Sequence, residues 1–305
     1  MTHDYHSRMP YQRSCGARPR IVLITRFAIR PEGPLAGWAQ PVDELFLRSD
    51  WLESRFVGFM KWTLPSVRRQ TDTDFSWIIA LDEEVDRAFA AKISDEVEGL
   101  GKLVFCTQQK GFLGSVRQAL VEDFHTAGQT PWIVTVRLDS DDCLASDFVE
   151  TLRKTPLRDG TVTCFPVGLA YDEKTELLFR KVAFANPFIA LCSNQPGRHI
   201  YELGGHRRVG LDNHLRNVWS ARPMWLKVYS NHSTSYFPPN GWPYLGFSSR
   251  SFRERFPISA LALHHQSWRK ISRSAIGFLG RNTAQLIPFV NAVYRLASQR
   301  RFSQS

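Results

Sequence analysis

Three aspartates follow a short apolar stretch in the middle of the chain. The stretch Trp132–Leu138 is β-branched and apolar apart from Arg137, which predicts a strand buried on both faces. Asp139, Asp141 and Asp142 come directly after it. Like charges crowded at the end of an interior strand disfavour one another's ionised forms, and desolvation adds to that cost. We therefore expect a cation at this point.

The spacing of the first two aspartates suits a divalent ion. Asp139 and Asp141 flank Ser140, so in an extended backbone their side chains point to the same side and can share one ion. Carboxylate oxygens suit Mg2+ or Mn2+, and Mg2+ commonly takes one or two carboxylates and leaves its other positions to phosphate and water. The alternative is a solvated acidic turn in which Asp139 or Asp142 only caps a helix. The buried strand in front of the acids favours the metal.

The elements that must position these acids alternate between strand and helix. The pattern predicts strands at 20–27, 77–81, 102–106 and 132–138, with helices at 52–67, 85–97 and after 115. Pro65 should interrupt the first helix. Such alternation indicates right-handed parallel crossovers in a doubly wound α/β sheet, whose ligands bind outside the carboxyl ends of the strands. Neither a dinucleotide fingerprint nor a P-loop is present.

The second half of the chain has a different pattern. Short strands separated by proline and glycine follow Leu152, which predicts a mostly parallel sheet with a small antiparallel portion. Basic, amphipathic C-terminal helices are expected after Ser267. We divide the chain into a disordered leader at 1–19, a main domain at 20–235 and a basic, aromatic-rich extension at 236–305.

Charge and cysteine content narrow the class of protein. The net charge is +10, and from Arg250 onward ten Lys or Arg residues stand against the single Glu254. A basic tail this local indicates contact with phosphates or with an anionic membrane surface, and it does not indicate a nucleic-acid partner. Alternatively, the tail packs on the domain at 20–235. Five cysteines without a C-x-x-C pair indicate a reducing compartment. With neither a signal peptide nor a membrane span in the sequence, we expect a cytoplasmic protein, with the inner face of the membrane as its contact.

Two segments resemble a known family. Arg137–Asp142 resembles the Asp-x-Asp motif of glycosyltransferases with the A-type, family-two-like nucleotide-binding fold, and with Phe148–Leu152 behind it looks like the bacterial family of putative rhamnosyltransferases. Leu64–Asp82 is similar to the same transferases in reading Pro-Ser-x-x-x-Gln-Thr, Asp-Phe, strand, acid. The resemblance covers about residues 20–235. It implies transfer of a hexose, with rhamnose from dTDP-rhamnose as one donor, to a saccharide or glycolipid acceptor.

The resemblance also implies a nucleotide site. Thr25 and Arg26, at the end of the first strand, would hold the base and ribose, although Arg26 could equally pair with one of the acids. Asp82 would accept a hydrogen bond from the base or ribose. Arg117, expected in the first turn of a helix, would reach the same pocket, and a surface arginine is the equal alternative. Asp139 belongs to both the nucleotide site and the metal site.

Two histidines are candidates for the diphosphate end of the donor. His232 resembles the position at which the family places a histidine that completes the metal or contacts diphosphate. His206 could do the same, because Arg207 and Arg208 beside it suit diphosphate. A structural histidine is the alternative for each.

Acceptor activation needs a carboxylate. In an inverting transferase this group takes the proton of the acceptor hydroxyl. Asp212 is our candidate base, Glu202 and Asp172 are its rivals, and a helix cap is the alternative role for Asp212. Trp242 could stack on a sugar or belong to the core.

Two other classes of protein remain open. A nucleotidyltransferase or pyrophosphorylase would also place a metal at strand ends, but it should carry a Gly-rich phosphate loop after the first strand, and residues 26–30 do not form one. A non-catalytic carbohydrate-binding protein could use the acids to hold a structural cation.

Overall fold

A seven-stranded sheet forms the centre of the protein. The computed structural model describes residues 18–30, 48–126, 132–205, 209, 215–230, 242–243 and 250–256. The strand order is β10-β6-β9-β4-β1-β2-β3. β1 (Arg20–Ala28), β2 (Phe75–Asp82), β3 (Lys102–Cys106) and β4 (Ile133–Asp139) run parallel. β9 (Ala190–Ser193) is antiparallel to β4 and to β6 (Val162–Cys164), and β10 (Leu215–Asn217) is parallel to β6.

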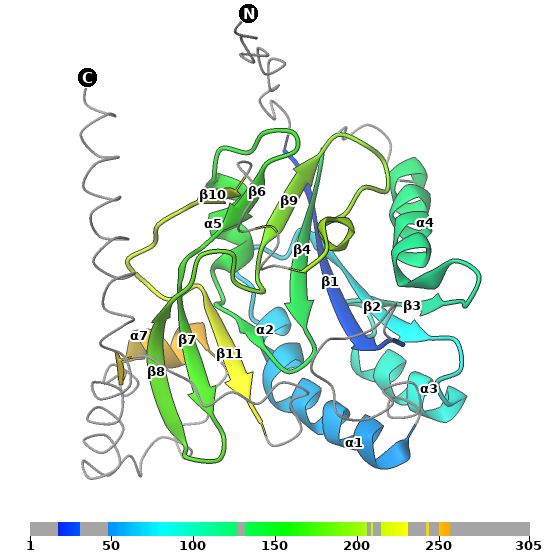
Figure 1. The fold of residues 1–305 in the computed structure, drawn as a ribbon, viewed down its shortest axis with the longest axis horizontal. Helices are drawn as coiled ribbons and strands as arrows, with labels where there is room; N and C mark the ends of the chain where they lie inside the picture. The colour runs from blue at the N-terminus through cyan, green and yellow to red at the C-terminus, as the bar shows by residue number, and fades with distance from the viewer. Residues whose placement is uncertain are drawn as a thin grey trace, which may run out of the picture.

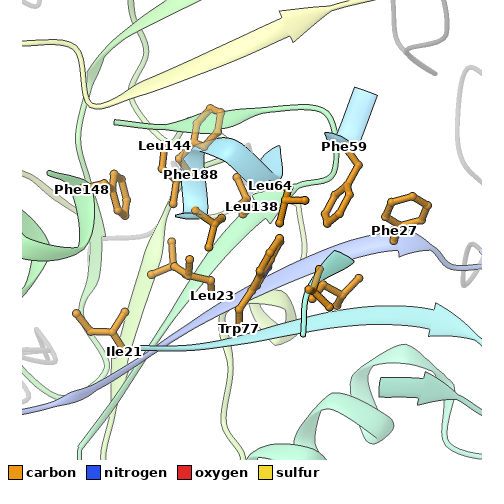
Figure 2. Packing of buried hydrophobic residues seen from close by; sticks show 14 of the residues in the cluster. Ile21, Leu23, Phe27, Phe59, Leu64, Trp77, Leu138, Leu144, Phe148 and Phe188 are labelled. Atoms are coloured by element: carbon orange, nitrogen blue, oxygen red, sulfur yellow. The ribbon is translucent and has the colours of Figure 1, made fainter. Parts of the chain in front are cut away.

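Helices cover both faces of this sheet (Figure 1). One face packs against α1 (Ser49–Gly58), η2 (Phe59–Thr63), α2 (Leu64–Arg68), α3 (Arg87–Glu96) and α5 (Phe148–Lys154). Figure 2 shows Phe59 and Leu64 above Trp77 on this face. The opposite face packs against α4 (Gly111–Thr126) and the 3-10 turn η3 (Ile200–Leu203). Successive residues of a strand point to opposite faces, so in β1 Ile21 and Leu23 join one core while Val22 and Ile24 join the other.

A smaller five-stranded sheet lies beside the first. Its order is β12 (Trp242–Pro243), β8 (Leu177–Val182), β7 (Val167–Asp172), β11 (Trp225–Tyr229) and β5 (Cys143–Leu144). All its neighbours pair antiparallel except β7 and β11. The helix α7 (Arg250–Arg255) is close to this sheet, since Phe252 packs in a cluster with Leu226 and Trp62. The chain crosses from the central sheet to the smaller one between β4 and β5.

The predicted fold class is confirmed, with local corrections. The prediction that Pro65 interrupts the first helix was wrong: residues 49–68 stay helical through a π-helical segment, and Pro65 lies directly after that segment, at the start of α2. α4 begins at Gly111, so Arg117 is not in its first turn. Asp147 is the N-cap residue of α5.

Parts of the predicted organisation lie outside the described residues. These include the leader up to residue 17 and the C-terminal extension, apart from 242–243 and 250–256. Membrane contact through that extension stays a prediction. Within the described ranges, no helix combines the length and the apolar character that a membrane crossing requires.

A close approach between the strands of the smaller sheet requires a glycine. A Cβ at Gly168 would lie 2.1 Å from ring atoms of Trp225. That indole is buried, stacks on Phe188 with ring centroids 5.0 Å apart, and donates to the carbonyl of Phe165 at 2.7 Å. The ring is therefore held on three sides and cannot move to admit a methyl group.

We predict that Gly168→Ala lowers the free energy of unfolding by about 2–4 kcal/mol, because the added methyl overlaps a fixed ring. Gly205→Ala is the matched control, since a Cβ there meets no atom within 4 Å. Urea unfolding followed by tryptophan fluorescence compares the two. Equal stability of both variants would contradict this account of Gly168.

Candidate functional site

The three aspartates form a turn that joins the two sheets. β4 ends at Asp139, residues 140 and 141 turn, and the backbone N–H of Asp142 donates to the carbonyl of Asp139 at 3.3 Å. The premise that Asp139 and Asp141 lie on one extended strand was therefore wrong, because the strand stops at the first of them. The two carboxylates instead belong to one tight turn, which we call the acid turn (residues 139–142).

The helical segment 49–68 fixes one side of the acid turn. Thr63, at the end of the π-helical segment, donates its hydroxyl to the carbonyl of Asp142 at 2.9 Å. The backbone N–H of Leu144 donates to Ser66 Oγ at 3.3 Å, and Gln70 donates to the carbonyl of Ala145 at 2.8 Å. Short π-helical segments occur frequently at functional sites. Here the segment lies where the helix contacts the acid turn and the strand β5 that follows it.

β11 fixes the other side through Asp142. This carboxylate is fully buried; its Oδ1 accepts the backbone N–H of Val228 at 2.8 Å and its Oδ2 lies 3.1 Å from Lys227 Nζ. Burial raises the pKa of Asp142 to about 7, Asp139 and Asp141 add to the effect, and Lys227 opposes it. Asp142 thus serves the architecture, and its oxygens are engaged within the protein.

Asp139 lies among positive charges. Burial by itself would raise the pKa of its carboxyl, but Arg137, Lys227, Arg26 and Arg55 together hold the pKa well below its usual range. Arg137 Nη2 is 3.4 Å from Asp139 Oδ1. Asp139 is therefore ionised at neutral pH, which a metal ligand of this type requires.

An aromatic ring supports two of these arginines. Arg26 on β1 lies opposite Asp139 on the neighbouring strand β4. The guanidinium carbons of Arg26 and Arg137 each lie 5.1 Å from the ring centroid of Tyr201, which is buried on η3. Burial raises the pKa of Tyr201 to about 12, and its hydroxyl donates to the carbonyl of Ile24 at 3.3 Å. The ring holds both cations beside Asp139 without neutralising them.

The other predicted nucleotide residues are spread along the sheet edge. Asp82 ends β2, accepts the backbone N–H of Glu84 at 3.0 Å, and lies 4.0 Å from Arg30 Nε. Thr25 is buried, and its hydroxyl accepts the indole N–H of Trp77 at 3.0 Å. The side chain of Thr25 therefore serves the core, and the prediction that it faces a nucleotide finds no support in its position.

Arg117 and the rival bases lie at the margin of the site. Arg117 is largely exposed and pairs with Glu202 at 2.8 Å, so Glu202 is already engaged by a cation. Asp172 accepts from the backbone N–H of Lys174 at 3.1 Å and from the hydroxyl of Thr175 at 2.7 Å. Those bonds stabilise the β7–β8 turn. Asp212, His206 and His232 lie outside the described residues, and of Trp242 only the backbone is described.

Of the three aspartates, Asp139 and Asp141 are the candidates for a divalent cation, because both oxygens of Asp142 are engaged by Lys227 and Val228. Two carboxylates that leave positions for water and phosphate are a common donor set for Mg2+ and Mn2+. Within the described ranges, no group of three His, Cys, Asp or Glu residues forms a metal cage. The ligands from this part of the chain would then be Asp139 and Asp141, with phosphate and water completing the shell.

Three residues of the site were missed by sequence reasoning. Tyr201 and Lys227 carried no signal, because a tyrosine in a turn and a lysine in an apolar strand are common. Arg55 did carry one: it lies on the apolar face of the helical repeat, between the buried Leu52 and Phe56, where a cation needs a partner. In the structure Arg55 Nη1 lies 3.0 Å from Asp141 Oδ2.

Comparison with known proteins identifies the family. The family model described as "Putative rhamnosyl transferase" matches residues 20–238, and the chain therefore belongs to this family of glycosyltransferases. No curated protein matches the sequence.

Several solved glycosyltransferase structures share a distant likeness. TarS of S. aureus (residues 1–349) is 9% identical with a TM-score of 0.35, over 69% of this chain and 60% of that one. Its complex with UDP is 10% identical with a TM-score of 0.34, over 69% and 61%. The glycosyltransferase GlyE of Streptococcus pneumoniae TIGR4 is 11% identical with a TM-score of 0.31, over 66% and 45%. The chain spans less than two thirds of the length of each of these proteins.

We predict that Lys227→Met lowers the free energy of unfolding by about 3–5 kcal/mol, because it leaves the Asp142 carboxylate buried without its cation. The double change Lys227→Met with Asp142→Asn should cost less than the single change. Lys154→Met is the control, since Lys154 is an exposed partner of Glu150. Urea unfolding at neutral pH measures all three. A single change that is no worse than the control would refute the pairing.

A second prediction concerns pH. His199 is buried, and burial lowers the pKa of its ring. The unfolded chain therefore binds a proton at a higher pH than the folded chain, so the stability contributed by neutral His199 is present above about pH 6.5 and is lost as the pH falls below that value.

We expect the difference in unfolding free energy between wild type and His199→Gln to shrink between pH 7.5 and pH 5.5. Chemical denaturation at the two pH values measures it. A difference that stays constant would show that folding does not lower the pKa of His199.

Proposed function

We propose that the protein is a metal-dependent glycosyltransferase that moves a hexose from a nucleotide-diphosphate sugar to a saccharide or glycolipid acceptor, with dTDP-rhamnose as the first donor to test. The family match supports the reaction class. The observation that carries the proposal is the acid turn itself: Asp139 and Asp141 stand at the carboxyl end of the central strand β4, in a turn fixed from both sides. In open α/β sheets this edge is where ligands bind.

Asp139 and Asp141 would hold Mn2+ or Mg2+ in this proposal. The ion, when bound, neutralises the charge that develops on the leaving diphosphate. Asp142 keeps the acid turn in place through Val228 and Lys227. The turn therefore presents its two other carboxylates without needing the ion to shape it.

Fixed positive charge supports the same reaction. Arg26 and Arg137 lie beside Asp139, held by the ring of Tyr201, and donors that are already in place need no reorganisation as negative charge appears on the diphosphate. Asp82, at the end of the neighbouring strand β2, is the group we assign to the base or ribose. Asp212 remains our proposed base for the acceptor hydroxyl.

The test is a panel of nucleotide sugars incubated with Mn2+, with release of the nucleoside diphosphate as readout and water or a saccharide as acceptor. We predict that Asp141→Asn lowers the rate by about 100-fold or more, because the ion loses one of two carboxylates. Asp95→Asn, an exposed carboxylate on α3, is the control. Thermal unfolding checks that both variants fold.

The outcomes separate the candidate functions. Release of a nucleoside diphosphate in step with glycosylated product supports the transferase. Release of pyrophosphate from a nucleoside triphosphate and a sugar phosphate would instead identify a nucleotidyltransferase. Binding of sugars with no release from any donor would favour a carbohydrate-binding protein.

A further inference from the structure

Arg55 reaches the acid turn from the helix that packs under it. Its Nη1 lies 3.0 Å from Asp141 Oδ2, and its Nη2 donates to Ser140 Oγ at 2.5 Å. The guanidinium lies 5.4 Å from the ring centroid of Trp51, and the side chain is only 12% exposed. Arg55 thus pairs with the carboxylate of Asp141, which the proposed function assigns to a metal ion.

The contact leaves Arg55 incompletely satisfied. Its Nε is buried and has no hydrogen-bond partner. The guanidinium also divides its two terminal nitrogens between Asp141 and Ser140, so the parallel two-bond pairing that makes arginine and carboxylate strong partners is not formed. A buried donor without an acceptor is destabilising, because it loses its hydrogen bonds to water and gains none in return. The arrangement is therefore better suited to a change of partner than to holding the fold together.

The surroundings contain more positive than negative charge. Four cations act on Asp139, namely Arg137, Lys227, Arg26 and Arg55. Within the part of the chain that the structure describes, they face the three aspartates of the acid turn. Such an excess attracts an anion, and a diphosphate suits guanidinium donors.

The backbone allows Arg55 to change partner without moving its helix. The helix is anchored to the acid turn eight residues further on, by Thr63. At Gly58, a Cβ would lie 3.7 Å from Asp141 Cβ, so the helix passes directly beneath this carboxylate. Arg55 lies one turn of helix before Gly58, and rotation about its side-chain bonds is enough to redirect its guanidinium.

We propose that Arg55 is a diphosphate-binding residue that shares Asp141 with the divalent cation. Arg55 holds the carboxylate while the ion is absent; when the ion takes that carboxylate, the guanidinium donates to the diphosphate of the donor. This inference rests on the proposed function for the identity of the anion. Arg55 therefore weakens binding of the metal ion alone and strengthens binding of the nucleotide diphosphate.

The experiment measures binding of Mn2+ alone by electron paramagnetic resonance, and binding of UDP and dTDP in saturating Mn2+ by calorimetry. Arg55→Met removes the charge and keeps a long apolar side chain against Trp51. We expect Arg55→Met to bind Mn2+ about threefold to tenfold more tightly than wild type, and the nucleotide diphosphates about tenfold or more weakly. Arg55→Lys should restore part of the nucleotide affinity.

Arg48→Met is the matched control, because Arg48 precedes the same helix but is exposed and pairs with Asp50. It should leave both affinities unchanged. A purely structural Arg55 that only positions Asp141 gives the opposite sign for the metal, since Arg55→Met would then bind Mn2+ more weakly. That result, or unchanged nucleotide affinity in Arg55→Met, overturns the inference.

Failure of the inference and failure of the proposed function remain distinguishable. If neither wild type nor Arg55→Met binds Mn2+, the competition has no second partner, and the inference falls together with metal dependence. Transfer itself is judged separately, by the release of nucleoside diphosphate from the donor panel. If wild type releases nucleoside diphosphate and binds Mn2+ while Arg55→Met matches it in both affinities, only the inference is lost.

Discussion

The site depends on how the acid turn is held between two parts of the fold. Its backbone carbonyl at Asp142 accepts from Thr63 at the end of a π-helical segment, and its carboxylate at Asp142 accepts from the backbone of β11. Both contacts use the one aspartate that is fully buried. Asp142 therefore anchors the turn, and its burial keeps Asp139 and Asp141 at fixed positions between the central sheet and the smaller sheet.

The same constraint explains the distribution of positive charge. Because three carboxylates are desolvated in four consecutive positions, the fold must place cations within reach of each. Lys227 serves Asp142, Arg137 serves Asp139, and Arg55 serves Asp141. The first pairing is with a fully buried carboxylate, whereas in our proposal the other two carboxylates can exchange their arginine for the metal ion. The proposal thus divides structural and binding roles within a single turn.

The sequence predicted the architecture well because its signals are local. The alternation of buried strands and helices in the first half, and the aspartates that follow one of those strands, were enough to place the sheet edge and the acid turn. What failed was also local in character: Pro65 was expected to break a helix that continues through a π-helical segment, and the extended spacing of Asp139 and Asp141 is a turn in the structure. Propensity and periodicity do not specify such irregular geometry.

The partners of the aspartates could not be predicted in the same way. Lys227 and Tyr201 reach the acid turn only through pairings between segments far apart in the chain, for which the sequence holds no periodic signal. Arg55 could have been found, since a cation on the buried side of a helix implies a buried anion. For Thr25 the sequence predicted the place on the strand but not the face that its side chain takes. That side chain faces the core, where its hydroxyl accepts the indole N–H of Trp77.

The most direct test of the central claim is the anomalous scattering of manganese in crystals grown with Mn2+ and a nucleoside diphosphate. We predict a single strong peak within coordination distance of carboxylate oxygens from both Asp139 and Asp141, next to the diphosphate. A nucleotide bound at this edge with both carboxylates still paired to Arg137 and Arg55, and with no peak between them, would contradict the account.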